Sequence, residues 1–347
     1  MKFGFVVPTL TGFHRSQSDR QGGYRERFAR SHELCALAES LGYDFAAIGE
    51  HRFTPDGLDS SAPLLVISAL AARTSRLRFC TNIVILALHD PVELAEQVAT
   101  LDELSDGRVI LGVGLGYRPY EFEQIGLDFR QRVSRFEEAI AVLRAAWRDE
   151  PANFEGRHFH LRNANVAPKP VQRPSPPIWI GAQTPPAIDR AARLGDGWLA
   201  DHIQSATAMQ PLIAGFHNAA GNAARPRTLV INRKVAIAPS RAEAEQRYLS
   251  RTLDLFRRYP DYGVVFEDQA FLGKLLSGRR MGVDDVPPDQ IIAGTPRDCI
   301  AALRQVRDLT QCDYVIADFG EACEGEDYQA LRDAIEFFGR EVIPAFG

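Results

Sequence analysis

The stretch LRFCTNIVILALHDPVELAEQVATLDELSDGRVILGVGLG, residues 77–116, contains the pattern that decides the fold. Its first part, Leu77–Leu86, and its last part, Arg108–Gly114, are short and nearly continuous in apolar character. Runs of this kind are typical of parallel strands that are covered by helices. Between them, Pro91–Leu104 has the spacing of an amphipathic helix that begins at a proline and ends near Gly107. The stretch therefore predicts a strand–helix–strand unit with parallel strands.

The same alternation continues along the rest of the chain. Further strand candidates are Lys2–Val7, Asp44–Gly49, Pro177–Gly181, Gly197–Asp201, Leu229–Ala238 and Asp313–Asp318. Further helical patterns are Arg27–Leu41, Pro63–Thr74, Ser134–Arg148, Pro185–Leu194, Thr207–Ala220, Arg241–Arg257 and Pro296–Asp308. Eight strands that alternate with helices, without a clear linker, predict an α/β fold of the (β/α)8 TIM-barrel class. A doubly wound sheet is the alternative, because it produces the same alternation.

Two stretches interrupt the alternation, and we expect residues 1–347 to form a single barrel domain with these two insertions. The first, at about 153–177, contains a proline-rich run and is typical of a small hairpin followed by an extended return. The second, at about 256–291, is long enough to predict a functional loop or lid. A disordered surface insertion is the alternative for this second stretch.

Charge and composition argue against several classes of protein. The 347 residues include 40 Lys and Arg against 45 Asp and Glu, a net charge of −5, which lacks the basic surface of a nucleic-acid or anionic-membrane binder. No apolar run approaches the roughly 20 residues that cross a bilayer. The five cysteines show no C-x-x-C spacing, so neither a disulfide framework nor a metal site is indicated. The first residues lead directly into a strand-like pattern, and we expect a reduced, cytoplasmic protein.

Candidate functional residues follow the strands, because barrel enzymes carry their sites at the C-terminal ends of the strands. Glu50 and His51 follow the second strand. An imidazole titrates near neutral pH, so His51 is a candidate general acid or base, with a solvent-exposed loop histidine as the alternative. Strand alternation would turn Glu50 the other way, so the two residues need not act as a pair.

Two further loops have the character of ligand-binding segments. The run Gly112-x-Gly114-x-Gly116 lacks the spacing of a dinucleotide fingerprint. A strand end without side chains would still let a flat ligand or a phosphate approach the backbone, with a plain tight turn as the alternative. The segment Gly181–Pro185 ends a strand and opens a helix, whose N–H groups and the Thr184 hydroxyl would suit a phosphate. A helix cap without a ligand is the alternative there.

Taken together and in order, the motifs of the chain resemble the bacterial luciferase-like monooxygenase superfamily of flavin- and deazaflavin-dependent (β/α)8 oxidoreductases. The resemblance extends from Lys2 to about Phe319. The motifs that carry it are AAIGEHRFT (46–54), HDPVELAEQ (89–97), LDELSDGR (101–108), LGVGLGY (111–117), PPIWIGA (176–182), AARLGDGW (191–198) and AGTP (293–296). Two positions depart from the family pattern. Arg52 replaces a second histidine, and Leu115 replaces an arginine that contacts the cofactor phosphate. Arg118 or a residue from an insertion could take over that contact.

The resemblance implies a flavin in the C-terminal mouth of the barrel and a role for individual residues. Asn82 and Ile83 match a bulge of the third strand where the family often has a non-proline cis peptide against the flavin ring. The cofactor-binding residues implied are Asn82, Ile83, Gly114, Gly116, Tyr117, Gly181, Ala182, Gln183 and Thr184. His51, with Glu50 beside it, would carry the proton transfer, and Asp201 and His202 would contact the substrate.

The function that we expect is a two-component flavin-dependent monooxygenase. It would take reduced FMN from a separate flavin reductase, react it with O2 through a C4a-peroxyflavin and transfer one oxygen atom to a small organic substrate. One alternative is a hydride-transfer oxidoreductase that uses the deazaflavin F-420, and another is a non-catalytic flavin-binding partner subunit. The family resemblance also implies a homodimer. The sequence does not identify the substrate.

Overall fold

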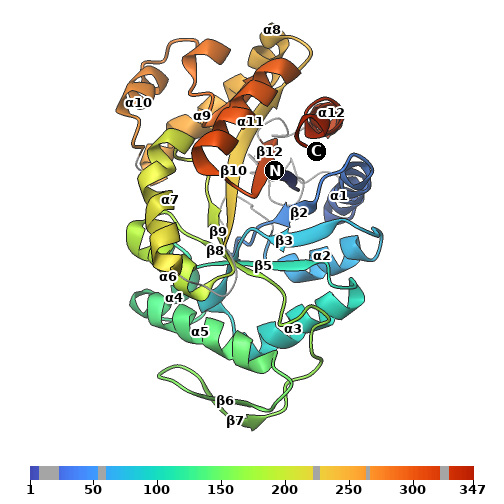
Figure 1. Cartoon of the computed structure of the whole chain (residues 1–347), viewed down its shortest axis with the longest axis vertical. Helices are drawn as coiled ribbons and strands as arrows, with labels where there is room; N and C mark the ends of the chain where they lie inside the picture. Colours follow the sequence, from blue (N-terminus) through green and yellow to red (C-terminus); the bar gives the residue numbers. More distant parts are fainter. Residues whose placement is uncertain (8–22, 54–59, 222–226, 263–265, 321–327) are drawn as a thin grey trace.

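Eight parallel strands close into a barrel in the computed structural model (Figure 1). The residues that the structure describes are 1–7, 23–53, 60–221, 227–262, 266–320 and 328–347. The barrel strands, in their order around it, are β1 (Lys2–Val6), β2 (Phe45–Ile48), β3 (Arg78–Thr81), β5 (Val109–Gly114), β8 (Ile178–Gly181), β9 (Gly197–Ala200), β10 (Thr228–Ile237) and β12 (Tyr314–Asp318). The circle closes because β10 pairs with both β9 and β12, and β12 pairs with β1. The (β/α)8 prediction is confirmed, and the doubly wound alternative is wrong.

Helices cover the outside of the barrel (Figure 1). Those that connect successive barrel strands include α1 (Gly23–Ser40), α2 (Pro63–Ala71), α3 (Pro91–Leu104), α5 (Arg132–Ala146), α6 (Pro185–Leu194), α7 (Ala206–Ala220) and α11 (Pro296–Thr310), and α12 (Tyr328–Glu341) follows the last strand. Short elements between them are β4 (Val84–Ile85), η3 (Leu86–Leu88), α4 (Pro119–Glu123), η4 (Phe129–Gln131) and, at the end of the chain, η9 (Ile343–Phe346). Several helices begin at a proline because the N–H that proline lacks has no partner in the first helical turn.

Aromatic side chains fill the N-terminal end of the barrel. The rings of Phe45, Trp179 and Tyr314, near the starts of their strands, lie with centroids 5.4–5.7 Å apart. Gly4 on β1 makes room for them, since a Cβ at that position would lie 2.4 Å from the Phe45 ring. Smaller side chains above them, including Leu199, complete the interior cluster. A ligand site must therefore lie at the opposite, C-terminal end.

The first insertion contains the hairpin that the sequence predicted. Its strands β6 (Ala152–Glu155) and β7 (His160–Ala164) are antiparallel and project at the bottom of Figure 1. The carboxylate of Glu138 on α5 accepts the backbone N–H groups of residues 157–159 at distances of 2.8–3.3 Å. The hairpin is thereby attached to the outer helix layer, away from the C-terminal mouth.

The second insertion folds into short helices and one strand. The predicted helix Arg241–Arg257 forms just before it as three consecutive pieces, α8 (Arg241–Ala244), a π-helical turn η5 (Glu245–Leu249) and α9 (Ser250–Arg258). The insertion itself, at about 256–291, contains η6 (Tyr259–Tyr262), α10 (Gln269–Leu276) and η7 (Val283–Asp285) and leads into β11 (Ile291–Gly294). Strand β11, which the sequence pattern did not predict, pairs with the second half of β10, where Lys234 lies opposite Ile291. Phe256, Tyr259 and Phe266 pack together at ring-centroid distances of 5.3–6.4 Å. The role of this segment as a lid stays a prediction.

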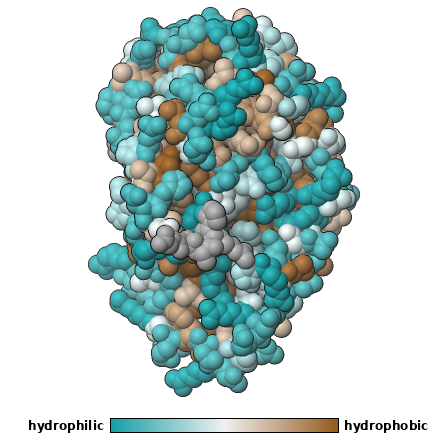
Figure 2. Space-filling view, in the orientation of Figure 1, coloured by the Kyte–Doolittle hydropathy of each residue, from teal (hydrophilic) through white to brown (hydrophobic). Residues whose placement is uncertain are grey.

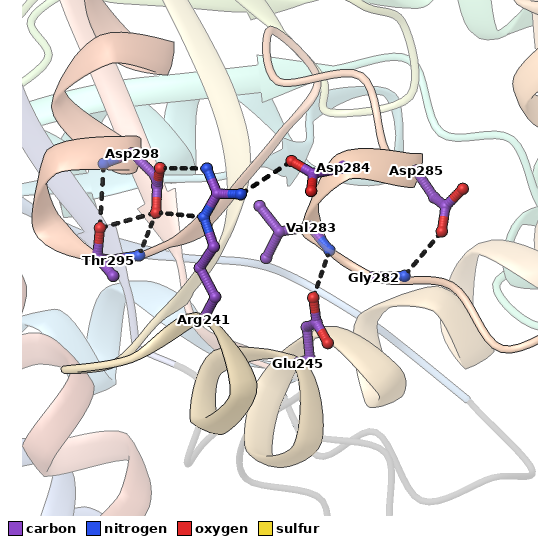
Figure 3. Close-up of polar contacts among 8 residues, drawn as sticks. All are labelled: Arg241, Glu245, Gly282, Val283, Asp284, Asp285, Thr295 and Asp298. Atoms are coloured by element: carbon purple, nitrogen blue, oxygen red, sulfur yellow. Dashed lines mark hydrogen bonds and ion pairs between the residues drawn. The ribbon is translucent and has the colours of Figure 1, made fainter.

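Arg241 fastens the insertion to the outside of the barrel (Figure 3). Its guanidinium lies 2.6 Å from Asp298 at the start of α11 and 3.0 Å from Asp284 in η7. Asp298 also accepts hydrogen bonds from the backbone N–H and the hydroxyl of Thr295, at 2.9 and 2.7 Å. A cavity of about 350 Å³ lies beside this cluster, lined partly by α11. None of the residues that line it is among the predicted site residues.

The surface shows no large apolar face in the view of Figure 2, where hydrophobic side chains form small, separate patches among hydrophilic ones. No helix among the described residues has the length and apolar character needed to span a bilayer.

Candidate active site

The C-terminal mouth of the barrel has two walls of different composition. On β9, β10 and β12, the side chains of Leu199, Val230 and Ile316 face the barrel interior. Because side chains alternate along a strand, the residues two positions further on, and four positions further on in β10, face the same way, into the mouth. They form the charged wall, which consists of Asp201, Asn232, Lys234 and Asp318. The glycine wall, at the ends of β2, β3, β5 and β8, consists of Gly49, Ile83, Gly112, Gly114 and Gly181.

A bulge at the end of β3 shapes the glycine wall. The peptide between Asn82 and Ile83 is cis, as the family resemblance implied. The chain then returns to the sheet as β4, where Val84 lies opposite Val113. The hydroxyl of Thr81 donates to the Gly112 carbonyl at 2.7 Å and fastens the start of the bulge to β5.

The glycines of β5 make room for this bulge. A Cβ at Gly112 would lie 1.8 Å from the Thr81 carbonyl oxygen, and one at Gly114 would lie 2.0 Å from Cδ1 of Ile83. The same spacing of two residues brings Gly116 against Ile85. The run is therefore neither a plain tight turn nor a bare backbone: the bulge occupies the space that its missing side chains leave. Direct contact of Gly114, Gly116 or Tyr117 with a cofactor stays a prediction.

Ile83 provides the surface of this wall. Its side chain is partly buried, packs on the interior cluster of the barrel and lies over Gly114 and Gly181. A Cβ at Gly181 would be in ordinary contact, 3.4 Å from Cγ2 of Ile83. The result is an apolar surface at the mouth without projecting side chains from β5 or β8.

His51 and Glu50, adjacent in sequence, have different surroundings. His51 is partly buried, and its backbone N–H donates to the Ser60 carbonyl at 3.0 Å. Glu50 is buried behind the bulge, where its carboxylate accepts the Ile85 N–H at 2.8 Å and lies 2.9 and 3.0 Å from Nε2 of His89. Sequence reasoning did not single out His89 as a partner of Glu50. The Glu50 carboxylate is thus held by Ile85 and His89, and the catalytic roles of Glu50 and His51 stay predictions.

The start of α6 offers fewer donors to a phosphate than the sequence pattern implied. Pro185 and Pro186 occupy the first two helical positions and have no N–H. The N–H of Ala187 already donates to the Thr184 carbonyl at 2.9 Å. The prediction that the first turn of α6 offers a set of free N–H groups is therefore wrong. Ala182 is buried, whereas Gln183 and Thr184 are exposed, and the Thr184 hydroxyl makes no capping hydrogen bond to the helix.

Arg118 is the cation nearest in sequence to the glycine run. Its guanidinium lies 5.1 Å from the centroid of the Tyr117 ring and donates to the Tyr120 hydroxyl at 3.2 Å. Although burial opposes its charge, the hydroxyl groups of Tyr117 and Tyr120 raise its pKa. This arginine therefore stays positively charged at the mouth side of β5.

A buried ion pair dominates the charged wall. Nζ of Lys234 lies 2.9 Å from Asp318, and their side chains are 6% and 10% exposed. Burial alone would raise the pKa of Asp318, but the ammonium of Lys234 holds that pKa below its ordinary value. Sequence reasoning missed both residues. The available signal was the polar run Asn232-Arg233-Lys234 inside an otherwise apolar strand.

Asp201 also belongs to this wall, and the next residue, His202, lies beside it. Burial raises the pKa of Asp201 even though the Ile203 N–H, at 2.8 Å, and the Gln183 side chain donate to its carboxylate. Nε2 of His202 lies 2.5 Å from the Tyr259 hydroxyl, and burial together with the charge of Lys234 lowers the pKa of His202 to about 3. The structure thus brings Gln183 to Asp201 and joins His202 to the second insertion.

Two polar atoms near these residues are buried and have no hydrogen-bond partner within the described part of the chain. They are Nδ1 of His202 and Oδ1 of Asn232. Asn232 lies opposite Ile316 on β12. It precedes Lys234 by two residues on β10, so both side chains face the barrel interior. Buried polar atoms without a partner are uncommon in folded proteins and point to a polar group or water that completes them.

The sequence of the chain is similar to those of known proteins. The sequence model of one family, luciferase-like monooxygenase, matches residues 1–311. The chain is 31% identical over 56% of its length to an FMNH(2)-dependent dimethylsulfone monooxygenase of Pseudomonas putida, covering 54% of that protein. It is 33% identical over 51% of its length to an F420-dependent glucose-6-phosphate dehydrogenase of Kineococcus radiotolerans, covering 55% of that protein. Each alignment thus spans about half of the relative.

A solved structure matches the whole chain. The monooxygenase RslO1 from Streptomyces bottropensis superimposes with a TM-score of 0.83 and 24% sequence identity, and the match covers 100% of both chains. At this level of identity the superposition establishes the fold, and the family comes from the sequence match.

Proposed function

This chain belongs to the luciferase-like monooxygenase family of enzymes, and from that premise we propose that it is a monooxygenase that uses reduced FMN and O2 to oxygenate a small organic substrate. A separate flavin reductase would supply the reduced FMN, and two copies of the chain would form a homodimer. The relative from Pseudomonas putida, described as FMNH(2)-dependent, supports the choice of cofactor.

The glycine wall is the observation that carries the binding of a flavin-type ring, and the choice of FMN rests on the relative. A tricyclic ring needs a flat apolar surface, and Ile83 lies over Gly114 and Gly181 with no β5 or β8 side chain projecting beside it. The bulge residues Asn82 and Ile83 would hold the ring. The residues present therefore fit a flavin. Reduced FMN supplies the activation of O2, for which amino-acid side chains have no equivalent chemistry.

The phosphate of the flavin would be held at the edge of this wall. Leu115 stands where the family pattern has an arginine, so Arg118 is our candidate for the positive charge that binds the phosphate. The exposed hydroxyl of Thr184 at the start of α6 is the second candidate, supported by the positive end of that helix dipole. Gln183 and Ala182 would complete the loop.

Proton transfer and substrate orientation would fall to other residues. His51 follows β2 at the mouth, and its imidazole is our candidate for the general acid or base. The charged wall and the adjoining His202 would orient the substrate, because Nδ1 of His202 and Oδ1 of Asn232 have no hydrogen-bond partner among the residues that the structure describes. A substrate with a hydrogen-bonding polar group would complete them.

A hydride-transfer enzyme that uses F-420 is the second candidate. Its support is the relative from Kineococcus radiotolerans, described as F420-dependent, which matches about the same share of the chain. Both cofactors carry a flat tricyclic ring, so the glycine wall suits either of them.

An anaerobic titration tests the proposal. Purified protein is titrated with FMN, reduced FMN and F-420, followed by fluorescence and difference absorbance, and the reduced complex is then mixed with O2 in a stopped-flow instrument. We expect a preference for reduced FMN and a reoxidation rate that differs from that of free reduced FMN. Tight F-420 binding with no response to either form of FMN would contradict the proposal and favour the F-420-dependent hydride-transfer enzyme.

A further inference from the structure

We propose that Glu50, held by His89, is a positioning residue that fixes the bulge carrying Asn82 and Ile83 against the glycine wall. The inference rests on the proposed function in one respect only, namely that the bulge faces the flavin. It replaces the direct catalytic role that the sequence suggested for Glu50.

Glu50 holds the bulge at two points. Its backbone N–H donates to the Ile83 carbonyl at 3.1 Å, and its carboxylate accepts the Ile85 N–H at 2.8 Å. One residue therefore binds both ends of a three-residue segment. Because the Ile83 carbonyl and the Ile85 N–H point to the same partner, the segment between them has little freedom to rotate.

His89 in turn fixes the carboxylate of Glu50. Nε2 of His89 lies 2.9 and 3.0 Å from the two carboxylate oxygens, and since a carboxylate can only accept, Nε2 is the donor. The backbone N–H of His89 donates to the Leu86 carbonyl at 3.1 Å. The next residue, Asp90, caps α3 through the N–H groups of Val92 and Glu93 at 2.8 and 3.1 Å. The carboxylate is thus anchored to the start of an outer helix.

Glu50 holds the bulge in close contact with the glycine wall. The Thr81 carbonyl and the Ile83 side chain lie where Cβ atoms of Gly112 and Gly114 would stand. The bulge is therefore confined between the glycines on one side and Glu50 on the other. The Glu50 side chain has 0% exposure, so it acts on the mouth through the bulge and not by contact with a ligand.

The chain offers a matched control at the opposite end of β3. The carboxylate of Glu39 on α1 accepts the backbone N–H groups of Ser75, Arg76 and Leu77 at 2.8–3.2 Å. This contact has the same chemistry as the Glu50 contact, but it lies at the N-terminal end of the barrel, away from the mouth. Backbone hydrogen bonds lower the pKa of Glu39 against the effect of burial, so it also accepts as a carboxylate.

The experiment compares Glu50→Ala, Glu50→Gln, His89→Ala and Glu39→Ala in the full-length protein. The first readout is hydrogen–deuterium exchange of the cofactor-free protein, resolved for residues 82–86 and 75–78. The second is the dissociation constant for reduced FMN, measured anaerobically. Circular dichroism verifies that each variant is folded, and His89→Ala keeps the test open if Glu50→Ala does not fold.

We expect Glu50→Ala to accelerate exchange in residues 82–86 at least tenfold and to weaken reduced FMN binding at least tenfold. His89→Ala should produce a smaller change of the same kind, and Glu50→Gln, which keeps an acceptor for the Ile85 N–H, should restore most of both values. Glu39→Ala should accelerate exchange only in residues 75–78 and leave FMN binding within twofold. Unchanged exchange in residues 82–86 in a folded Glu50→Ala protein would overturn the proposal. Because that readout needs no flavin, it stands even if the proposed function fails.

Discussion

The two walls of the barrel mouth solve opposite packing problems. The glycine wall lacks side chains, and the bulge after β3 fills the space, so that Ile83 covers Gly114 and Gly181. The charged wall buries Lys234 and Asp318 as an ion pair with side chains at most 10% exposed. The shape of the first wall follows from glycines that have no side chain. The shape of the second follows from buried charges that require partners.

This difference suggests a division of labour within one site. A wall without projecting side chains suits a flat apolar ring, whereas a wall of paired charges and incompletely bonded polar atoms suits a substrate that brings its own polar groups. The charged wall is also continuous with the second insertion, since His202 contacts Tyr259 of η6. We therefore expect substitutions in the glycine wall to affect flavin binding and those in the charged wall to affect stability and substrate use.

The largest effect should come from breaking the ion pair of the charged wall. Replacing Lys234 with Met leaves the Asp318 carboxylate buried without its cation, which we expect to cost about 3–5 kcal/mol in the free energy of unfolding at pH 7. The pKa of Asp318 should then rise above its unfolded value, so the loss should shrink as the pH falls and the carboxyl takes up a proton. Denaturant unfolding of Lys234→Met at pH 7 and pH 5 measures both effects.

The double variant Lys234→Met with Asp318→Leu is the control, because it removes both charges together. It should be more stable than Lys234→Met alone. A Lys234→Met protein as stable as the wild type at pH 7 would mean that the pair does not organise this wall.

The glycine wall should respond next, and unequally along β5. Gly112→Ala forces a Cβ against the backbone carbonyl of Thr81, which cannot rotate away, whereas Gly114→Ala meets only the end of the Ile83 side chain. We expect Gly112→Ala to destabilise by about 1–3 kcal/mol, the usual range for overpacking, and Gly114→Ala by less. Thermal and denaturant unfolding of the two variants provides the comparison. A larger loss of stability in Gly114→Ala than in Gly112→Ala would show that the backbone at Thr81 moves more easily than the Ile83 side chain.

A smaller, pH-dependent effect should arise from His202. Its pKa of about 3 lies below the value of about 6.5 of an unfolded histidine, so the unfolded chain takes up a proton that the folded chain does not between these values. Its contribution to stability is therefore present above about pH 6.5 and is lost as the pH falls, with a slope of at most ~1.4 kcal/mol per pH unit.

His202→Gln should flatten the acid limb of a stability-against-pH curve measured by urea unfolding between pH 7 and pH 4. His217→Gln is the matched control, because His217 is exposed on α7. An acid limb that stays unchanged in His202→Gln would show that His202 is not a buried neutral group beside the charged wall.

Sequence reasoning recovered the barrel because its evidence is repeated. Eight apolar strands, helices that begin at prolines and the order of the family motifs all indicate one architecture, and the strand boundaries agree with the structure to within a few residues. The site was recovered unevenly. Gly112, Gly114 and Asn82–Ile83 stood out individually, but their mutual packing did not, because it joins residues about 30 positions apart.

The charged wall was largely missed for a related reason. Lys234 and Asp318 lie 84 positions apart and face each other only because β10 and β12 are neighbours, which the order of strands around a barrel determines. The short strand β11 was missed because its apolar run is followed at once by the Thr295–Pro296 helix start. The prolines of α6 could have been recognised from the sequence alone, since Pro185 and Pro186 have no N–H to offer.

The most direct test of this account is the anaerobic dissociation constant for reduced FMN in one variant from each wall. Ile83→Ala removes the apolar surface of the glycine wall, and Asp201→Asn alters the charged wall while preserving its shape. We expect Ile83→Ala to raise the dissociation constant about tenfold, equivalent to about 1.4 kcal/mol, and Asp201→Asn to leave it within about twofold. A dissociation constant that rises in Asp201→Asn and not in Ile83→Ala would contradict the assignment of the flavin ring to the glycine wall.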